Sequence, residues 1–153
     1  MLFYLPLIKI SHEVGPAIGE VLENAKSGIE VLNLTGNRLG GLGLSAICRG
    51  LVVNTKLTKL YIADNMIDQL EEDLKGLSDF RDCLMNPDSA LTHIDLMYNR
   101  IGQEGAQILA PALGADNKKV QEFLVDLTLP MAEFELIFRR DAGGKKGKKG
   151  KKK

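Results

Sequence analysis

The stretch LTHIDLMYNRIGQEG, residues 91–105, spaces aliphatic residues so that they first alternate and then meet an asparagine. Its register Leu91, Ile94, Leu96, Asn99 and Ile101 follows the pattern L-x-x-L-x-L-x-x-N-x-L. Residues two apart on a strand point the same way, so Ile94 and Leu96 are expected to enter one core. Asn99 is expected where the chain leaves the strand. There its amide can bond backbone groups of its own coil and of the neighbouring coil.

The same pattern occurs twice earlier in the chain, and recurrence of this kind indicates a repeat architecture. One copy starts at Ile29 and another at Leu57, so the three starts lie 28 and then 34 residues apart. The two earlier registers are Ile29, Leu32, Leu34, Asn37, Leu39, Gly40 and Leu57, Leu60, Ile62, Asn65, Ile67. We therefore expect short strands that stack in chain order into a parallel sheet.

Two weaker copies flank these three, as expected of end repeats that must close a core. The last copy has Thr128 at the asparagine position, and the first copy has Ile10 there. Their aliphatic positions are Val120, Phe123 and Val125 in the last copy and Leu2, Leu5 and Leu7 in the first. About five strands are expected in total.

The second half of each repeat has helical spacing. Gly43, Ile47 and Leu51 match Gly105, Leu109 and Leu113, and the i, i+4 step puts each aliphatic pair on one helix face. Residues 15–22 show a similar spacing. Pro111 is expected to bend or shorten the helix that contains it.

The middle repeat departs from the pattern because it is six residues longer than the one before it. Its helix is expected to be extended, with apolar positions at Leu70, Leu74, Leu77, Phe80 and Leu84. The tract NPD, residues 86–88, then ends the helix, because proline disfavours helix at the preceding residue. The added turn is either a tolerated loop insertion or a docking feature.

The tracts LMYNRIGQEG, residues 96–105, and LTGNRLGGLG, residues 34–43, resemble the ribonuclease-inhibitor subfamily of leucine-rich repeats. The resemblance covers residues 1 to about 127. It implies an α/β fold: a right-handed solenoid in a short horseshoe arc, with parallel strands on the concave face and helices on the convex face. We expect the repeats in residues 1–127, a C-terminal cap helix in 128–142 and a Lys/Gly tail in 143–153.

The segment after the repeats begins with a break at Leu129 and Pro130. Residues 131–140 then show helical spacing, with Phe134, Ile137 and Phe138 on one face. We expect this helix to cover the end of the core, and the alternative is a free amphipathic helix that binds a partner.

Charge is unevenly distributed along a chain whose formal net charge is zero. Seven lysines fall in the tail, which leaves residues 1–144 at 0 − 7 = −7. The tail lysines are Lys145, Lys146, Lys148, Lys149, Lys151, Lys152 and Lys153. Such a segment is expected to attract polyanions, including acidic surfaces, RNA and anionic membranes, in a salt-sensitive way. It has no aromatic residue to stack on bases, and it could equally serve only solubility.

Chemistry-bearing residues are few. His93 and Asp95 share one strand face and could form an acid–base dyad or part of a metal site, but no nucleophile or third ligand accompanies them. Cys48 is expected in the core, and Cys83 on a helix surface or half-buried. No phosphate-binding loop follows a strand. We therefore expect no catalytic, cofactor or metal site.

The start of the chain, MLFYLPLIKI, lacks a basic segment and a small-residue cleavage site, so it is not interpreted as a signal peptide. No run approaches the ~18 apolar residues of a membrane helix. A cytoplasmic protein with reduced thiols is expected. Because the first repeat begins almost at Met1, the chain is either part of a longer solenoid or has an open end that a partner covers.

The remaining candidate site is the exposed side of the strands, the expected concave face. Apolar side chains exposed on a sheet usually indicate a partner. The candidate partner-binding residues are Val31, Asn33, Thr35, Lys59, Tyr61, His93, Asp95, Met97, Glu122, Leu124 and Asp126, and Ala63 occupies the same kind of position.

These observations favour a non-enzymatic scaffold that binds another protein. The resemblance extends loosely to small axonemal repeat proteins with Lys/Gly tails, which implies a cytoskeletal or ciliary setting and acidic tubulin tails as partners. One alternative is an enzyme regulator, since this repeat subtype includes ribonuclease inhibitors and activators of a small GTPase. Arg38 and Arg100 are then the candidate groups. Another alternative is weak, non-specific association with nucleic acid through the tail.

Overall fold

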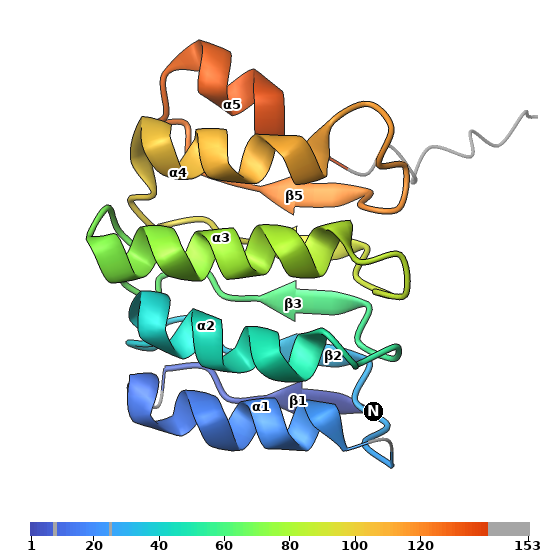
Figure 1. The fold of residues 1–153 in the computed structure, drawn as a ribbon. Coiled ribbons are helices and arrows are strands. Elements are labelled where there is room, and N and C mark those ends of the chain that lie inside the picture. The colour runs from blue at the N-terminus through green and yellow to red at the C-terminus, as the bar shows by residue number, and fades with distance from the viewer. Residues whose placement is uncertain (8, 25, 141–153) are drawn as a thin grey trace, which may run out of the picture.

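The computed structural model describes residues 1–7, 9–24 and 26–140. The strands are β1 (Leu2–Tyr4), β2 (Val31–Asn33), β3 (Lys59–Tyr61), β4 (His93–Asp95) and β5 (Glu122–Leu124). They form one five-stranded sheet in chain order, and every neighbouring pair is parallel (Figure 1). The expected stack of strands is therefore confirmed.

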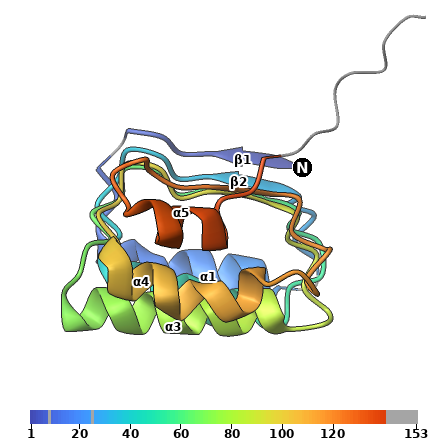
Figure 2. The same cartoon turned by 90° about the horizontal axis from the view of Figure 1, so that it is seen from above.

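Each strand is followed by helix, and the helices form a second layer. The α-helices are α1 (Gly15–Glu23), α2 (Gly40–Leu51), α3 (Glu71–Met85), α4 (Gly102–Leu109) and α5 (Met131–Ile137), with short 3-10 helices at His12–Val14 and Ala110–Leu113. Seen from above, the strands run along one side of the molecule and α1 to α4 along the other (Figure 2). This arrangement confirms the α/β solenoid of strand–helix repeats.

The core lies between the two layers and is built from the repeated aliphatic positions. Leu32, Leu60, Ile94 and Phe123 stand opposite one another in the strand register, and all four are buried. Burial of an aliphatic or aromatic side chain of this size contributes about 1.5–3 kcal/mol. Strands β2 to β5 thus each contribute one buried side chain to a continuous row that ties neighbouring repeats together.

The asparagines behave as their position in the repeat predicts. The Nδ2 of Asn37 donates to the carbonyl of Leu34 in its own repeat at 2.7 Å and to that of Leu5 in the preceding one at 2.8 Å. Its Oδ1 accepts the backbone N–H of Ile10 at 2.9 Å. Asn65 and Asn99 are buried in the equivalent turns. The amides therefore satisfy backbone groups of two adjacent coils.

The first repeat has a different register from the expected one. Phe3, rather than Leu5, pairs with Leu32, and Leu2 is 62% exposed. Ile10 still occupies the asparagine position. Ile10 lies seven positions after Phe3, whereas Asn37 lies five positions after Leu32. The loop absorbs these two additional residues, which spacing alone could not place.

The helix predictions for the later repeats are confirmed except at Leu70, which was expected at an apolar helix position but lies before α3, has an extended backbone and is 61% exposed. Helix α3 runs from Glu71 to Met85 and is capped by Asn86, directly before the proline. Helix α4 ends at Leu109, and the segment containing Pro111 continues as a 3-10 turn. Proline lacks the N–H that would extend the α-helix, which explains the change.

The end of the solenoid is covered by α5, which is shorter than the expected helix. It ends at Ile137, and Arg139 then forms an antiparallel bridge with Phe123 of β5. The guanidinium of Arg139 donates to carbonyls of the preceding loops, among them Val120 at 2.8 Å and Gly114 at 2.7 Å. The segment therefore caps the core through both apolar packing and hydrogen bonds. Within the described part of the chain, no helix has the length and apolarity needed to cross a membrane.

Candidate functional site

The exposed side of the sheet brings the expected partner-binding residues together. We call this surface the strand face. One row across it is Leu2, Val31, Lys59, His93, Glu122, and the next is Tyr4, Asn33, Tyr61, Asp95, Leu124. Thr35, Met97 and Asp126 follow directly after these rows. Residues that are far apart in the sequence therefore share one continuous surface.

The side chains of the strand face are half-buried by their neighbours, with Leu2 and Tyr4 on the outermost strand more exposed. Ala63 differs from the expectation, because only 3% of it is exposed. Helices α1 to α4 lie against the other side of the sheet (Figure 2). The strand face thus presents apolar and charged groups that no described helix covers.

Sequence reasoning missed four exposed apolar residues at this surface. Leu2 and Tyr4 join its rows because the first repeat has the shifted register. Tyr98 and Leu127 stand at its rim, 67% and 83% exposed. Each directly precedes the asparagine position of its repeat, which is Asn99 in one case and Thr128 in the other. Comparing that position between repeats would have found both.

Asn37, Asn65 and Asn99, which we call the ladder asparagines, are each preceded by a residue with an unusual backbone. These preceding residues are Gly36, Asp64 and Tyr98, with φ of 73°, 52° and 59°. The left-handed region is open to glycine but costs other residues about 1–2 kcal/mol. Tyr98 is held there in part by Asp126, whose Oδ2 accepts the Tyr98 N–H at 2.5 Å. A large exposed aromatic side chain at a strained position is a candidate contact with a partner.

The β4–β5 end of the strand face is acidic. Asp95, Glu122 and Asp126 lie close enough to influence one another, and burial together with these like charges raises the pKa of Asp95. The Oδ1 of Asp95 accepts the backbone N–H of Met97 at 3.0 Å, which opposes the shift. Among the described residues, none of these three carboxylates forms an ion pair. This end of the surface therefore favours a cationic ligand.

His93 and Asp95 do share the strand face, as their spacing predicted. The Nδ1 of His93 lies 2.8 Å from the hydroxyl of Thr92, while Asp95 accepts a hydrogen bond from its own turn. Both side chains are therefore engaged locally. Groups of at least three His, Cys, Asp and Glu residues that could hold a metal ion do not occur in the described ranges.

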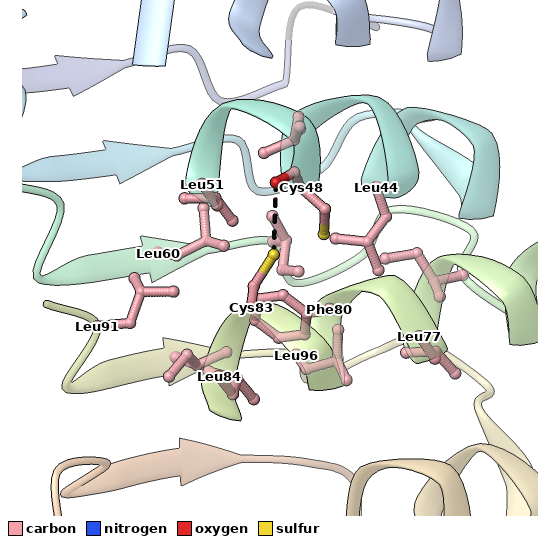
Figure 3. Close-up of a cluster of buried hydrophobic side chains, with 14 of the residues drawn as sticks. Leu44, Cys48, Leu51, Leu60, Leu77, Phe80, Cys83, Leu84, Leu91 and Leu96 are labelled. Atoms are coloured by element: carbon pink, nitrogen blue, oxygen red, sulfur yellow. Dashed lines mark hydrogen bonds between the residues drawn. The ribbon is translucent and has the colours of Figure 1, made fainter. Parts of the chain in front are cut away.

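The two cysteines meet between α2 and α3 (Figure 3). Cys48 is buried as expected, but the prediction of a surface or half-buried Cys83 was wrong, since only 1% of it is exposed. The Sγ of Cys83 lies 3.4 Å from the carbonyl oxygen of Cys48. Hydrogen bonding to Cys83 and burial raise the pKa of Cys48 well above its usual range. Protonated thiols are poor nucleophiles, so this pair serves the core.

A second polar surface lies on the edge where strands lead into helices. Arg38 and Arg100 are exposed there, each directly after a ladder asparagine. Arg38, Asp68 and Asp73 help to line a hollow of about 410 Å³ at this edge. The Oδ1 of Asp73 accepts the Gly41 N–H at 2.6 Å, which fixes the start of α2 against α3.

The lysines expected to bind polyanions, Lys145 to Lys153, lie outside the described residues. Their partners therefore stay a prediction, as do the domain boundaries at 127 and 142.

The repeats match a known family model, and the chain resembles parts of longer proteins. A family model described as "Leucine Rich repeat" matches residues 29–48 and 89–110. The chain is similar to "NACHT, LRR and PYD domains-containing protein 14" of Mus musculus, with 26% identity over 143 residues. That match covers 77% of this chain and 14% of the relative.

A second relative is named for an activity rather than for its domains. The chain is similar to "RAN GTPase-activating protein 2" of Arabidopsis thaliana, with 31% identity over 103 residues. The match covers 67% of this chain and 18% of that protein. The chain thus spans less than a fifth of the length of either relative.

Proposed function

The chain is a leucine-rich-repeat protein, and from that premise we propose that its strand face is a site for binding another protein. The observation that carries the proposal is the uncovered sheet surface, on which half-buried apolar residues stand beside carboxylates that form no ion pair with any described residue. Binding energy at protein interfaces concentrates in a few apolar or aromatic residues surrounded by polar ones. Tyr61, Met97 and Leu124 are the central residues of this kind.

The partner that suits this surface is a protein segment with both apolar and basic side chains. Tyr61 and Leu124 flank Asp95 in one row, so an apolar contact on either side would shield that carboxylate from water. Desolvation strengthens a charge pair, and complementary charges also raise the association rate. Exposed Tyr98 and Leu127 extend the apolar contact towards the rim.

Matched substitutions test the proposal. Met97→Lys/Leu124→Lys places two positive charges on the strand face. Leu42→Lys/Val53→Lys places two positive charges on exposed apolar positions of the helix layer. Both proteins are compared with the native chain in quantitative affinity capture, after circular dichroism has shown that they are folded. We expect the strand-face variant to lose a discrete set of proteins by about tenfold or more, as loss of interface hot spots predicts.

The control variant should retain that set of proteins. Equal losses from both variants would mean that the captured proteins respond to charge rather than to the strand face. Retention by both variants would place the binding site elsewhere. Either result would contradict the proposal.

A second candidate function is activation of a small GTPase. It is favoured by the similarity to RAN GTPase-activating protein 2 and by two exposed arginines at equivalent repeat positions, Arg38 and Arg100. An arginine that stabilises charge in the transition state can accelerate GTP hydrolysis by about 10³–10⁵. Single-turnover hydrolysis by Ran with native, Arg38→Ala and Arg100→Ala protein would test this. No acceleration by native protein would exclude it.

The narrower assignments rest on the resemblance of the repeats. A cytoskeletal or axonemal setting, tubulin tails as partners, and the ribonuclease-inhibitor subfamily remain proposals of this kind. A co-sedimentation assay with microtubules, before and after proteolytic removal of the acidic tubulin tails, separates the tubulin proposal from general protein binding. Binding that persists after removal would contradict a role for those tails.

A further inference from the structure

We propose that the Lys/Gly segment, residues 143–153, docks on the acidic end of the strand face of its own chain and competes there with the protein partner. This inference rests on the proposed function, because the segment would regulate access to the same surface. It requires a surface of opposite charge, a chain long enough to reach that surface, and carboxylates there that no described cation already neutralises.

The surface of opposite charge is formed by three carboxylates. Asp95 lies on β4, Glu122 lies on β5, and Asp126 lies just after β5. All three side chains are half-buried, and none of them is ion-paired with any other residue that the structure describes. Burial raises the pKa of Asp95, and repulsion from the other two carboxylates raises it further. A cation placed here would relieve that repulsion.

The backbone bridge between Arg139 and Phe123 fixes the point from which the Lys/Gly segment must reach the strand face. The N–H of each residue donates to the carbonyl of the other, at 2.9 and 2.8 Å, so the described chain ends beside β5. Thirteen residues follow Arg140. At about 3.3 Å per residue they can span about 40 Å. The whole sheet, with four strand spacings of about 4.8 Å, is only about 19 Å wide.

Three of the described cations near this end, Arg139, Lys119 and Lys59, are engaged elsewhere or stand at a distance. The guanidinium of Arg139 donates to backbone carbonyls, including that of Asn117 at 2.5 Å. The Nζ of Lys119 donates to the carbonyl of Asn86 at 2.7 Å. Lys59 lies on β3, two strands away from β5. Its charge would repel the segment and confine it to β4 and β5.

The Lys/Gly segment provides the missing charge. It contains seven lysines and no acidic residue, while residues 1–144 carry a net charge of −7. Tethering gives such a segment an effective concentration of about 1 mM at its own surface, so even weak attraction would populate the docked state. Because the contact is electrostatic and exposed, it should weaken as salt shortens the screening length to below about 10 Å.

The test compares amide chemical shifts by NMR in two full-length proteins. One is the native chain, and in the other all seven lysines of the segment are changed to Gln. At low ionic strength, about 20 mM, we expect the two spectra to differ at residues 93–97 and 122–126. Those differences should disappear at about 0.5 M salt.

A matched pair of carboxylate variants locates the docking surface. Glu122→Gln/Asp126→Asn should reduce the shift differences at residues 93–97, while Glu71→Gln/Glu72→Gln on α3 should leave them unchanged. The amide introduced by Asp126→Asn retains an oxygen for the Tyr98 N–H, so the turn is preserved. No shift differences, differences centred on α3, or differences that survive high salt would each overturn the proposal.

Competition with the partner is measured separately. Changing the seven lysines to Gln should tighten partner binding by about threefold or more at low salt, because the surface is then free. Unchanged or weaker partner binding would overturn the competitive role. Failure of the strand face to bind any partner would instead refute the proposed function, and the NMR result would still decide whether the segment docks.

Discussion

The side-chain Oδ1 of Asn99 accepts the backbone N–H of Asn65 at 2.9 Å, across the boundary between two repeats. It also accepts the N–H of Ile67 at 3.1 Å, while its Nδ2 donates to the carbonyls of Ile62 and Leu96. Asn65 donates through Nδ2 as well, but its buried Oδ1 has no hydrogen-bond partner among the described residues. The two ladder asparagines therefore contribute unequally to stability.

We expect Asn99→Ala to lower the free energy of unfolding by about 2–4 kcal/mol, because it leaves buried backbone groups on both repeats without partners. Asn65→Ala should cost less, since that residue makes fewer hydrogen bonds and also loses an unpaired oxygen. Urea unfolding of both variants measures the difference. A larger loss from Asn65→Ala would contradict the unequal ladder.

Arg139 is expected to hold the C-terminal cap in place. Replacing it by Met removes a guanidinium that donates to the carbonyls of Leu113, Gly114, Asn117 and Val120. Loss of such charge-assisted hydrogen bonds should destabilise the protein by about 2–3 kcal/mol. Hydrogen exchange should accelerate first in α5. Arg140→Met, at an exposed position, is the control, and equal acceleration in both variants would contradict the role of Arg139.

The raised pKa of Asp95 makes stability depend on pH. The folded protein binds this proton more tightly than the unfolded chain does, so ionised Asp95 costs stability at neutral pH. The cost disappears as the pH falls through the range just above the usual aspartate pKa. Asp95→Asn should therefore stabilise the protein at about pH 7, by less than about 1 kcal/mol because the group is only half-buried.

This difference should vanish towards about pH 4, where the native carboxyl is also neutral. Thermal unfolding measured across the pH range is the appropriate readout. Asp88→Asn, in the exposed turn after α3, controls for general loss of negative charge. A stabilisation that grows as the pH falls would have the wrong sign.

Tyr98 should be dispensable for folding but not for binding. Tyr98→Asn introduces a residue that tolerates the left-handed backbone, so we expect unfolding free energy to stay the same or to rise by up to about 1 kcal/mol. Partner capture should nevertheless fall, because an exposed aromatic contact is removed. Chemical unfolding and quantitative capture check the two halves. Destabilisation by more than about 1 kcal/mol would indicate a structural role instead.

The repeat pattern was sufficient to predict most of the fold. Alternating aliphatic residues before Asn37, Asn65 and Asn99 specify an inward-facing strand, and helical spacing specifies the layer behind it. The shift in the first repeat could not be predicted, because Leu2, Leu5 and Leu7 fit the pattern as well as Phe3 does. Only packing against Leu32 selects between these registers.

The candidate site was predictable to a similar extent. Strand alternation placed Tyr61, Asp95 and Leu124 on one surface, since alternation follows from backbone geometry alone. The burial of Cys83 was not predictable, because it depends on the distance between α2 and α3. The rim residues Tyr98 and Leu127 were missed because their exposure arises at the turn before the ladder position, where Tyr98 has a left-handed backbone.

The central claim is that the strand face binds protein, and site-specific photo-crosslinking tests it most directly. Benzoylphenylalanine would replace Tyr61 on the strand face and, in a second protein, Val53 after α2. We predict discrete crosslinked partners from position 61 that Met97→Lys/Leu124→Lys abolishes, and none of these partners from position 53. The same partners crosslinking from position 53, or none from position 61, would contradict the account.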